Sequence, residues 1–444
     1  MAARLIKIDW PDFGVPDLPP ALTLPEMRGR LAKLRRAIAA LGYDAAVVYG
    51  DREHAANLHW LTGFDPRFEE AVLIVTSQDA LLLAGNECLQ YTGISPLVTA
   101  GDIRTGHCAS LSLPSQPRDG RRLADWLAEA VPAGCALGAI GWKWFEAGEV
   151  DDPATVLDIP AFVADPLRRI ARRVENATDL MMHPGYGLRA RVNAAEIARL
   201  EFSNHMAARA LRRMAFSFRE GMTDFEAYES AGVGGLPMGC HSTFATGSRA
   251  GQQIGFNICH WGSNICRAGW LARTADDLPP DARGYLAAFA GPYVEALSQW
   301  FSLMRPGVAG GEVWARMRAA LPFETFGVYL NPGHLIGLDE WLSSPIYEGS
   351  SEPLASGMAM QCDVIPGHPV WGSTRMEDGY VIADADLRAE LQALYPAVAA
   401  RCQARAEFMK TVIGLDVAPT LLPLADTCGI VAPYLLDPSQ VIAL

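Results

Sequence analysis

The chain has 444 residues, of which half are apolar and 20% are charged, and its formal net charge is −13. This length exceeds what one compact core usually holds, so we expect two or more domains. The acidic balance argues against nucleic acid or an anionic membrane as the partner. No long apolar run and no apolar signal core are present, so we expect no membrane span and a cytoplasmic protein.

Cysteine usage agrees with that location. The nine cysteines are an odd number, and no two of them have the CxxC spacing. This pattern is typical of reduced thiols in a cytoplasm rather than of a disulfide framework. We expect most of them to be small buried apolar residues.

The first half of the chain predicts an α/β domain. A Pro-rich stretch, residues 1–23, precedes a helix with apolar residues at helical spacing that Gly42 should end. A strand, a turn with a helix and a hairpin are then predicted from DAAVVYGD, NLHWLTGF and AVLIVTSQDALLLAG. The charged segment 165–179 predicts a helical connector between domains.

The second half predicts helices over a sheet, an α+β arrangement. Asn193 is expected to be the N-cap of a long helix, with Glu196 completing a capping box. A strand and turn are predicted for 239–251, and ICHWGSNICRAGWLART predicts strand, loop and strand. Further helices are expected at 281–304 and, as one long helix, at 384–409.

One stretch, residues 331–384, carries the chemistry. In it, His334, Asp363, Arg375 and Glu377 lie in short apolar runs bounded by Gly and Pro, which predict buried strands. An unpaired buried charge is strongly unfavourable, so these groups should meet in one polar site. A buried structural network of ion pairs is the alternative interpretation.

A set of motifs follows a recognisable order along the chain. They are NLHWLTGF, AAEIARLE, Arg273–Thr274, MRPGV, PGHLIG, GMAMQCD and TRMED. On these motifs the chain resembles the creatinase/aminopeptidase P/prolidase superfamily over nearly its whole length. The resemblance implies an α/β N-terminal creatinase-type domain, residues 1–175, followed by an α+β pita-bread domain, residues 176–444. It also implies a homodimer in which Arg67 of one subunit would reach the pocket of the other.

Peptidases that share these motifs hold two metal ions with five side chains. The resemblance assigns the ligand histidine to His334 and the last glutamate to Glu377. The first glutamate of the family falls on Asp363, a shorter carboxylate.

The two aspartates of the family lie in a strand pair that ends in the Arg-Thr motif. Counting back from Arg273–Thr274, these positions fall on Cys259 or His260 and on Trp270, so no acid is present. We therefore expect no dinuclear metal site and no cofactor. A single divalent ion on His334, Asp363 and Glu377 is the alternative, since histidine with carboxylates suits several metals.

Creatinase and ectoine hydrolase are members of the superfamily that hydrolyse C–N bonds without metal. The resemblance therefore implies a metal-independent, creatinase-like hydrolase of a small nitrogen-containing molecule. In this hypothesis His334 transfers protons together with His260 or His241. Asp363 and Glu377 would bind and polarise a cationic substrate.

Further residues are candidates for contact with the substrate. Arg375 stands two residues before Glu377, so both face one side of a strand. The candidates are Arg375, Asp339, Trp270 and Arg67.

Two other functions stay open. One is a divergent Xaa-Pro aminopeptidase or prolidase-like metallopeptidase with one or two ions. The other is a non-catalytic pita-bread binding protein. The presence of PGH, Asp363 and RMED, which match the motifs of the enzymes, argues against this function. A metal-dependent lyase like the dimethylsulfoniopropionate lyases of this superfamily ranks below both.

Overall fold

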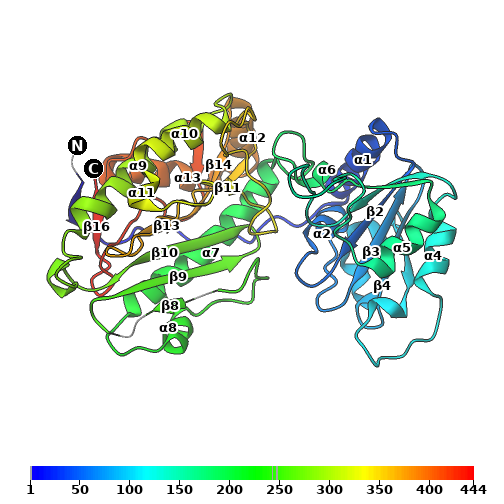
Figure 1. Ribbon diagram of the computed structural model, residues 1–444, viewed down its shortest axis with the longest axis horizontal. Coiled ribbons are helices and arrows are strands. Elements are labelled where there is room, and N and C mark those ends of the chain that lie inside the picture. The colour runs from blue at the N-terminus through cyan, green and yellow to red at the C-terminus, as the bar shows by residue number, and fades with distance from the viewer. Residues whose placement is uncertain (1–2, 243, 247–248) are drawn as a thin grey trace. The chain divides into compact units, whose positions relative to one another are not determined.

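The computed structural model describes residues 3–242, 244–246 and 249–444, and it divides into two compact units (Figure 1). The first unit contains residues 21–189, and the second contains residues 1–20 together with 190–444. The expected domains, residues 1–175 and 176–444, differ from this division in two places. The boundary lies at residue 189 rather than 175, and residues 1–20 belong to the second unit. The reason is strand β1 (Arg4–Lys7), which pairs antiparallel with β16 (Gln440–Ala443) and joins the N-terminal arm to the second unit.

The N-terminal unit is built on a mixed six-stranded sheet of order β5-β4-β3-β2-β6-β7. Its strands are β2 (Ala45–Gly50), β3 (Ala71–Thr76), β4 (Ala80–Ala84), β5 (Arg104–His107), β6 (Ala136–Ile140) and β7 (Arg173–Asn176). Its α-helices are α1 (Leu24–Ala40), α2 (Ala56–Thr62), α3 (Pro96–Thr99), α4 (Leu123–Ala130), α5 (Ala161–Ile170) and α6 (Asp179–Met182). The predicted helix, hairpin and α/β class are confirmed, and Gly42 follows α1 with a φ of +73°.

The predicted connector helix at 165–179 is wrong in its second part. Helix α5 ends at Ile170, and the chain then forms β7, which pairs in parallel with β6. Val174 is buried there opposite Leu137, so this segment completes the edge of the first sheet. The arginines of this segment are exposed, some at the end of α5 and some at the start of β7. Their spacing along the chain resembles that of charges on one continuous helix, which explains the wrong prediction.

Two four-stranded sheets form the C-terminal unit, with orders β13-β10-β9-β8 and β11-β12-β14-β15. The first has β8 (Phe244–Thr246), β9 (Gln252–His260), β10 (Ser263–Leu271) and β13 (Arg375–Glu377). The second has β11 (His334–Leu335), β12 (Ala359–Gln361), β14 (Gly379–Ile382) and β15 (Leu421–Pro423). The helices are α7 (Ala194–Ser217), α8 (Asp224–Ala231), α9 (Gly291–Leu303), α10 (Gly310–Ala320), α11 (Phe323–Phe326), α12 (Ala385–Leu394) and α13 (Pro396–Phe408). Helix α7 packs on β9 and β10, and α13 packs on β15.

Helix starts in this unit are predicted correctly where a capping motif marks them in the sequence. Asn193 caps α7 in a capping box with Glu196. The predicted helix 384–409 is instead two helices, because Pro396 has no backbone N–H to continue α12 and starts α13. The expected helix 281–304 is α9 preceded by a π-helical turn.

The strand predicted within 239–251 coincides with β8, while residues 243, 247 and 248 lie outside the described residues. Eight of the nine cysteines are buried, as expected, and Cys240 is partly exposed. Among the residues that the structure describes, no helix has the length and apolar character that a membrane crossing requires.

Candidate active site

Four of the residues singled out from the sequence come together in the C-terminal unit. His334 begins β11, Asp363 follows the end of β12, and both Arg375 and Glu377 lie on β13. Strand β13 pairs with β10, and β11 pairs with β12, so residues of both sheets contribute to the site. Gln361 of β12 links the sheets directly, because its Nε2 donates to the carbonyl of the β10 residue Asn264 at 2.7 Å.

The imidazole of His334 lies at the centre of the site and is fully buried. Its Nδ1 is 3.1 Å from the carbonyl oxygen of Leu335, which only accepts hydrogen bonds, so Nδ1 carries a proton. In the neutral ring, Nε2 therefore presents a lone pair, and it has no hydrogen-bond partner among the described residues. Trp341 stacks on the ring at a centroid distance of 4.1 Å and covers one face.

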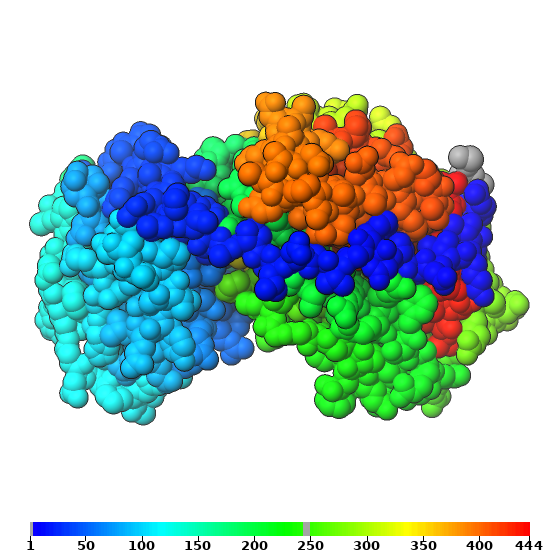
Figure 2. Space-filling model, turned by 180° about the vertical axis from the view of Figure 1, so that it is seen from behind, coloured from blue at the N-terminus to red at the C-terminus, as the bar shows by residue number. Residues whose placement is uncertain are grey.

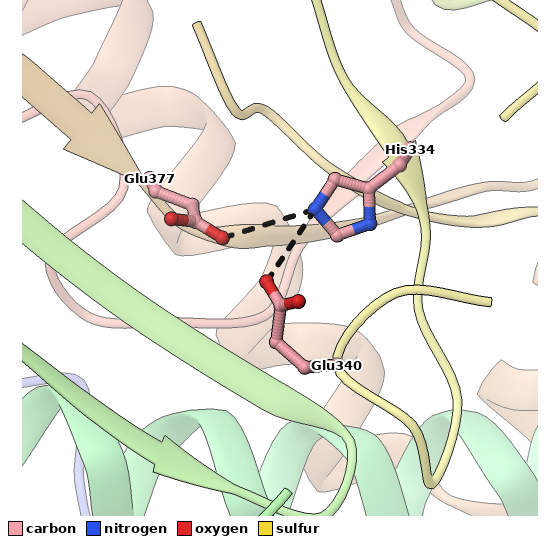
Figure 3. Close-up of side chains that lie close together, drawn as sticks. All are labelled: His334, Glu340 and Glu377. Carbon is pink, nitrogen blue, oxygen red and sulfur yellow. Dashed lines mark ion pairs between the residues drawn. The ribbon is translucent and has the colours of Figure 1, made fainter. Parts of the chain in front are cut away.

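Three carboxylates surround this lone pair. Glu340 Oε1 lies 3.7 Å from Nε2, and Asp363 Oδ2 and Glu377 Oε1 each lie 4.0 Å from it. In Figure 3 the side chains of Glu340 and Glu377 both point toward the same ring nitrogen. A lone pair and three anions facing one another repel, so the space between them suits a cation.

The guanidinium of Arg375 neutralises part of this negative charge. Its Nη2 lies 2.7 Å from Asp363 Oδ1 and 2.6 Å from Glu377 Oε2, and thus bridges the two acids. Burial, followed by the neighbouring Asp363 carboxylate, raises the pKa of Glu377 well above its usual value, while Arg375 opposes this shift. Arg375 therefore holds the two acids in place rather than being free for a substrate carboxylate.

Two asparagines complete the site, and sequence reasoning missed both. Asn264 of β10 donates from Nδ2 to Glu340 Oε1 and to Glu377 Oε1, each at 3.1 Å. Asn257 of β9 in turn donates to Asn264 Oδ1 at 2.9 Å. Asn264 thus contacts the acids and Asn257 supports it from behind, so the β9–β10 pair presents neutral amides to this side of the site.

The count back from Arg273–Thr274 led to Trp270, whereas Asn264 lies on the same strand nearer the turn of the β9–β10 hairpin. Its last strand pair is His260 with Ser263, with Gly262 in the turn at a φ of +83°. Asn264, close to this turn, is thus several positions before Trp270 along β10. The strand register, rather than the sequence, would have identified it.

Trp270 does not occupy the space beside His334, contrary to expectation. It lies toward the other end of β10, opposite Gln253, with its ring 6.1 Å from that of Tyr285. Its Nε1 donates to the carbonyl of Trp371 at 3.2 Å.

The two candidate partners of His334 in proton transfer are not placed for that role. Strand alternation puts His260 on the face of β9 opposite to that of Asn257, and burial lowers the pKa of its imidazole. Cys259 shares the face of Asn257, but its thiol accepts from the backbone N–H of Cys240 at 3.2 Å. His241 is exposed, in the segment before β8.

Asp339 was the expected acid of this loop in the site, but the neighbouring Glu340 is the residue that reaches His334. Both residues are partly exposed, but Glu340 is the one whose carboxylate faces His334. Arg67 is exposed in the N-terminal unit with a φ of +57°, and its guanidinium lies 4.8 Å above the ring of Tyr91. A contact between Arg67 and a second subunit stays a prediction.

The donor set fits one divalent ion and does not fit two. With all three carboxylates deprotonated, as metal binding requires, and one guanidinium beside them, two negative charges surround His334, which one divalent ion balances. His334, Glu340 and Glu377 offer one ligand atom each, all within 4.8 Å of one another. A second ion would need further acids where Asn257 and Asn264 stand, and its charge would be close to the Arg375 guanidinium.

Comparisons with known proteins agree with this architecture. Residues 30–147 match the family model of the Creatinase/Prolidase N-terminal domain. The sequence matches no curated protein at a significant level.

Solved structures match about four fifths of the chain at low sequence identity. The Xaa-Pro dipeptidase from Bacillus anthracis has 15% identity and a TM-score of 0.60, with 81% of this chain and 96% of that chain covered. Dipeptidase PepE from Mycobacterium ulcerans has 20% identity and a TM-score of 0.59, with 82% and 95% covered. The N-terminal domain of FACT complex subunit SPT16 from chickpea has 13% identity and a TM-score of 0.57, with 82% and 95% covered.

These likenesses define the class: an N-terminal creatinase-type domain followed by a pita-bread domain. The N-terminal match identifies residues 30–147 as similar to the Creatinase/Prolidase N-terminal domain, and the chain shares the fold of the two dipeptidase structures over about four fifths of its length. The predicted fold class is thereby confirmed, and the predicted superfamily is supported.

Proposed function

We propose that the protein is a hydrolase of a C–N bond, of the peptidase-like kind, that works with a single divalent ion. The observation that carries this proposal is the buried Nε2 lone pair of His334, which faces three carboxylates and has no hydrogen-bond partner among the described residues. The names of the prolidase and dipeptidase relatives support an amide bond as the target. These names favour a peptide substrate, as in the peptidase alternative, over a creatinase-like small molecule.

Each residue has a defined task in this proposal. His334, Glu340 and Glu377 would hold the ion, and the Nδ1–H bond to the Leu335 carbonyl fixes the ring for that purpose. A bound divalent ion would polarise a carbonyl group and lower the pKa of a water molecule. Asn264 fixes both glutamates with its amide, and it can add no negative charge that a second ion needs.

Arg375 and Asp363 form the supporting part of the site. The guanidinium binds Oε2 of Glu377, which opposes the rise in the pKa of this acid, and it leaves Oε1 directed at His334. Asp363, held on the other side of the guanidinium, has its Oδ2 within 4.0 Å of His334 and is placed to take or return a proton.

A second candidate is the metal-free hydrolase expected from the sequence. The bridging position of Arg375 favours it, because a guanidinium between Asp363 and Glu377 already supplies a fixed positive charge. In that case a proton on His334 Nε2 and the ammonium of the substrate would balance the remaining two negative charges. A cytoplasmic homodimer remains part of both proposals as a prediction.

A matched pair of variants tests the proposed function. Glu340→Gln removes one ligand charge, and we expect it to weaken binding of a divalent ion and hydrolysis of Xaa-Pro dipeptides about 10- to 100-fold. Asp339→Asn, the neighbouring exchange, should stay within about twofold of the unaltered protein in both measurements.

Chelation separates the two candidates. Removal of metal with a chelator should abolish hydrolysis, and one equivalent of Zn²⁺, Mn²⁺ or Co²⁺ should restore it. Full hydrolysis by a metal-free preparation would support the second candidate and contradict the first. No hydrolysis of any amide or other C–N substrate, with metal bound, would contradict both and favour a binding function.

A further inference from the structure

A second hollow of the C-terminal unit lies away from the candidate active site, under the N-terminal arm. Figure 2 shows the arm, in blue, lying across this unit between the region coloured green and the region coloured orange. The cavity has a volume of about 530 Å³, within the range of small-molecule sites, which is roughly 300–1,000 Å³. Residues of the arm, of α7 and of the segment that holds Asp426 and Thr427 line it.

Positive charge gathers on one wall of this cavity. Arg209, Arg212 and Arg213 follow one another on α7 at spacings that place them on one face of the helix. Arg212 donates to the carbonyl of Pro11 at 3.2 Å, and Arg213 donates to the carbonyl of Ala231 at 2.7 Å.

None of the three guanidinium groups is neutralised. Among the described residues no carboxylate forms an ion pair with Arg209, Arg212 or Arg213, and no hydrogen bond reaches the exposed Arg209 guanidinium. Burial, and then the charge of Arg209, lower the pKa of Arg213. In a chain with a net charge of −13, three cations left together without a partner are unusual.

The acids that line the cavity are already engaged. Asp426 pairs with Arg405 at 2.7 Å and lies 2.9 Å from Nδ1 of His205. Asp12 accepts from the backbone N–H of Gly14 at 2.9 Å. The charge facing the cavity is therefore positive.

An unpartnered buried group gives an independent sign of a ligand. His205 lines the cavity with only 3% of its surface exposed, and its Nε2 has no hydrogen-bond partner among the described residues. A buried polar atom left without a partner usually marks a missing water, ion or ligand. Apolar side chains also line the cavity, and they include Phe216, which lies on the same face of α7 as the arginines, and Val15 of the arm, both well exposed.

We propose that this cavity binds a small organic anion that has a phosphate or carboxylate head and an apolar body of about one ring. The guanidinium groups of Arg209 and Arg212 bind the head, since planar guanidinium groups match the oxygens of both anions. His205 supplies a further hydrogen bond at the floor, and Phe216 contacts the body. The site is separate from the residues around His334 and does not depend on the proposed hydrolase activity.

Calorimetric titration of the full-length protein tests the proposal. Phenyl phosphate and phenylacetate serve as the anionic probes, and whichever of the two binds more tightly identifies the head group. The expected result is saturable binding of one molecule per chain, at least tenfold tighter than that of inorganic phosphate or of neutral benzyl alcohol.

Variants then locate the site. Arg209→Ala and Arg212→Ala should weaken binding of the better probe at least tenfold, while Arg219→Ala, which removes an exposed arginine outside the cavity, should stay within twofold. Glu340→Gln should bind the probe as the unaltered protein does, which separates this site from the candidate active site. Absence of saturable binding of both aromatic anions, or equal binding by Arg209→Ala and the unaltered protein, would overturn the proposal.

Discussion

At the scale of single residues, one asparagine decides how much metal the site can hold. Asn264 donates hydrogen bonds to both Glu340 and Glu377. A carboxylate at the position of Asn264 would be needed to complete a second metal site. Its amide instead donates to the two acids and stabilises them without adding charge. Together with Asn257 and Arg375, this side chain therefore argues against a dinuclear site.

Asn264→Asp should reverse this effect. The added carboxylate faces two others, so we expect at least tenfold tighter binding of Mn²⁺ or Zn²⁺ and a lower Tm when a chelator is present. Asn193→Asp is the matched control, because it adds the same charge while keeping the N-cap of α7. Equal metal affinity in Asn264→Asp and the unaltered protein would contradict the role given to this residue.

His59 predicts a pH dependence of stability in the N-terminal unit. Burial, and then the charge of Arg30, lower the pKa of its imidazole to about 4. The unfolded state, with a pKa near 6.5, binds the proton first, so the free energy of unfolding falls as the pH drops from about 6.5 to about 4, by roughly 3 kcal/mol in total. Below about pH 4 both states are protonated and this loss is complete.

The variant His59→Gln isolates this contribution. Its stability relative to the unaltered protein should rise by roughly 3 kcal/mol between pH 7 and pH 4, because glutamine does not titrate. Thermal unfolding across this pH range measures the difference. Parallel stability curves for the two proteins would show that His59 titrates normally.

At the scale of elements, the N-terminal arm belongs to a unit that is distant in the sequence. Strand β1 pairs with β16, and Trp10 is 2% exposed, with its Nε1 donating to the carbonyl of Pro438 at 2.9 Å. Its ring also meets Phe216 of α7 edge to face at 5.4 Å. The arm is thus a structural part of the C-terminal unit.

Trp10→Ala should therefore destabilise the C-terminal unit by about 3–5 kcal/mol, the usual cost of removing a buried tryptophan. Differential scanning calorimetry should show a lower Tm for the transition of that unit, with the other transition unchanged. Leu18→Ala, at an 85% exposed position of the same arm, is the control and should have almost no effect. An unchanged transition in Trp10→Ala would mean that the arm is not needed.

At the scale of the whole molecule, the sequence predicts what is local and misses what depends on register. PGH and RMED identify His334 and Glu377 because each lies within a short run whose apolar pattern is unambiguous. Asn257 and Asn264 were missed because only strand pairing shows which side chains of β9 and β10 face the site. The choice of Glu340 over Asp339 depends on the path of a loop, and a one-residue difference there has no signature in composition.

The same limit explains the division of the chain. Residues 1–20 precede the N-terminal unit in sequence but pack with the C-terminal unit, because β1 finds its partner in β16. A pairing between strands separated by more than four hundred residues leaves no local pattern that composition or spacing could detect.

The metal content of the purified full-length protein tests the central claim most directly. The protein would be incubated with excess Zn²⁺ or Mn²⁺, freed of unbound ions by gel filtration and measured by elemental analysis. Because the acids around His334 carry two uncompensated negative charges once metal binding deprotonates them, we predict one ion per chain, and less in Glu340→Gln. Two ions per chain would contradict the account, since the asparagine wall and Arg375 leave no place for the second.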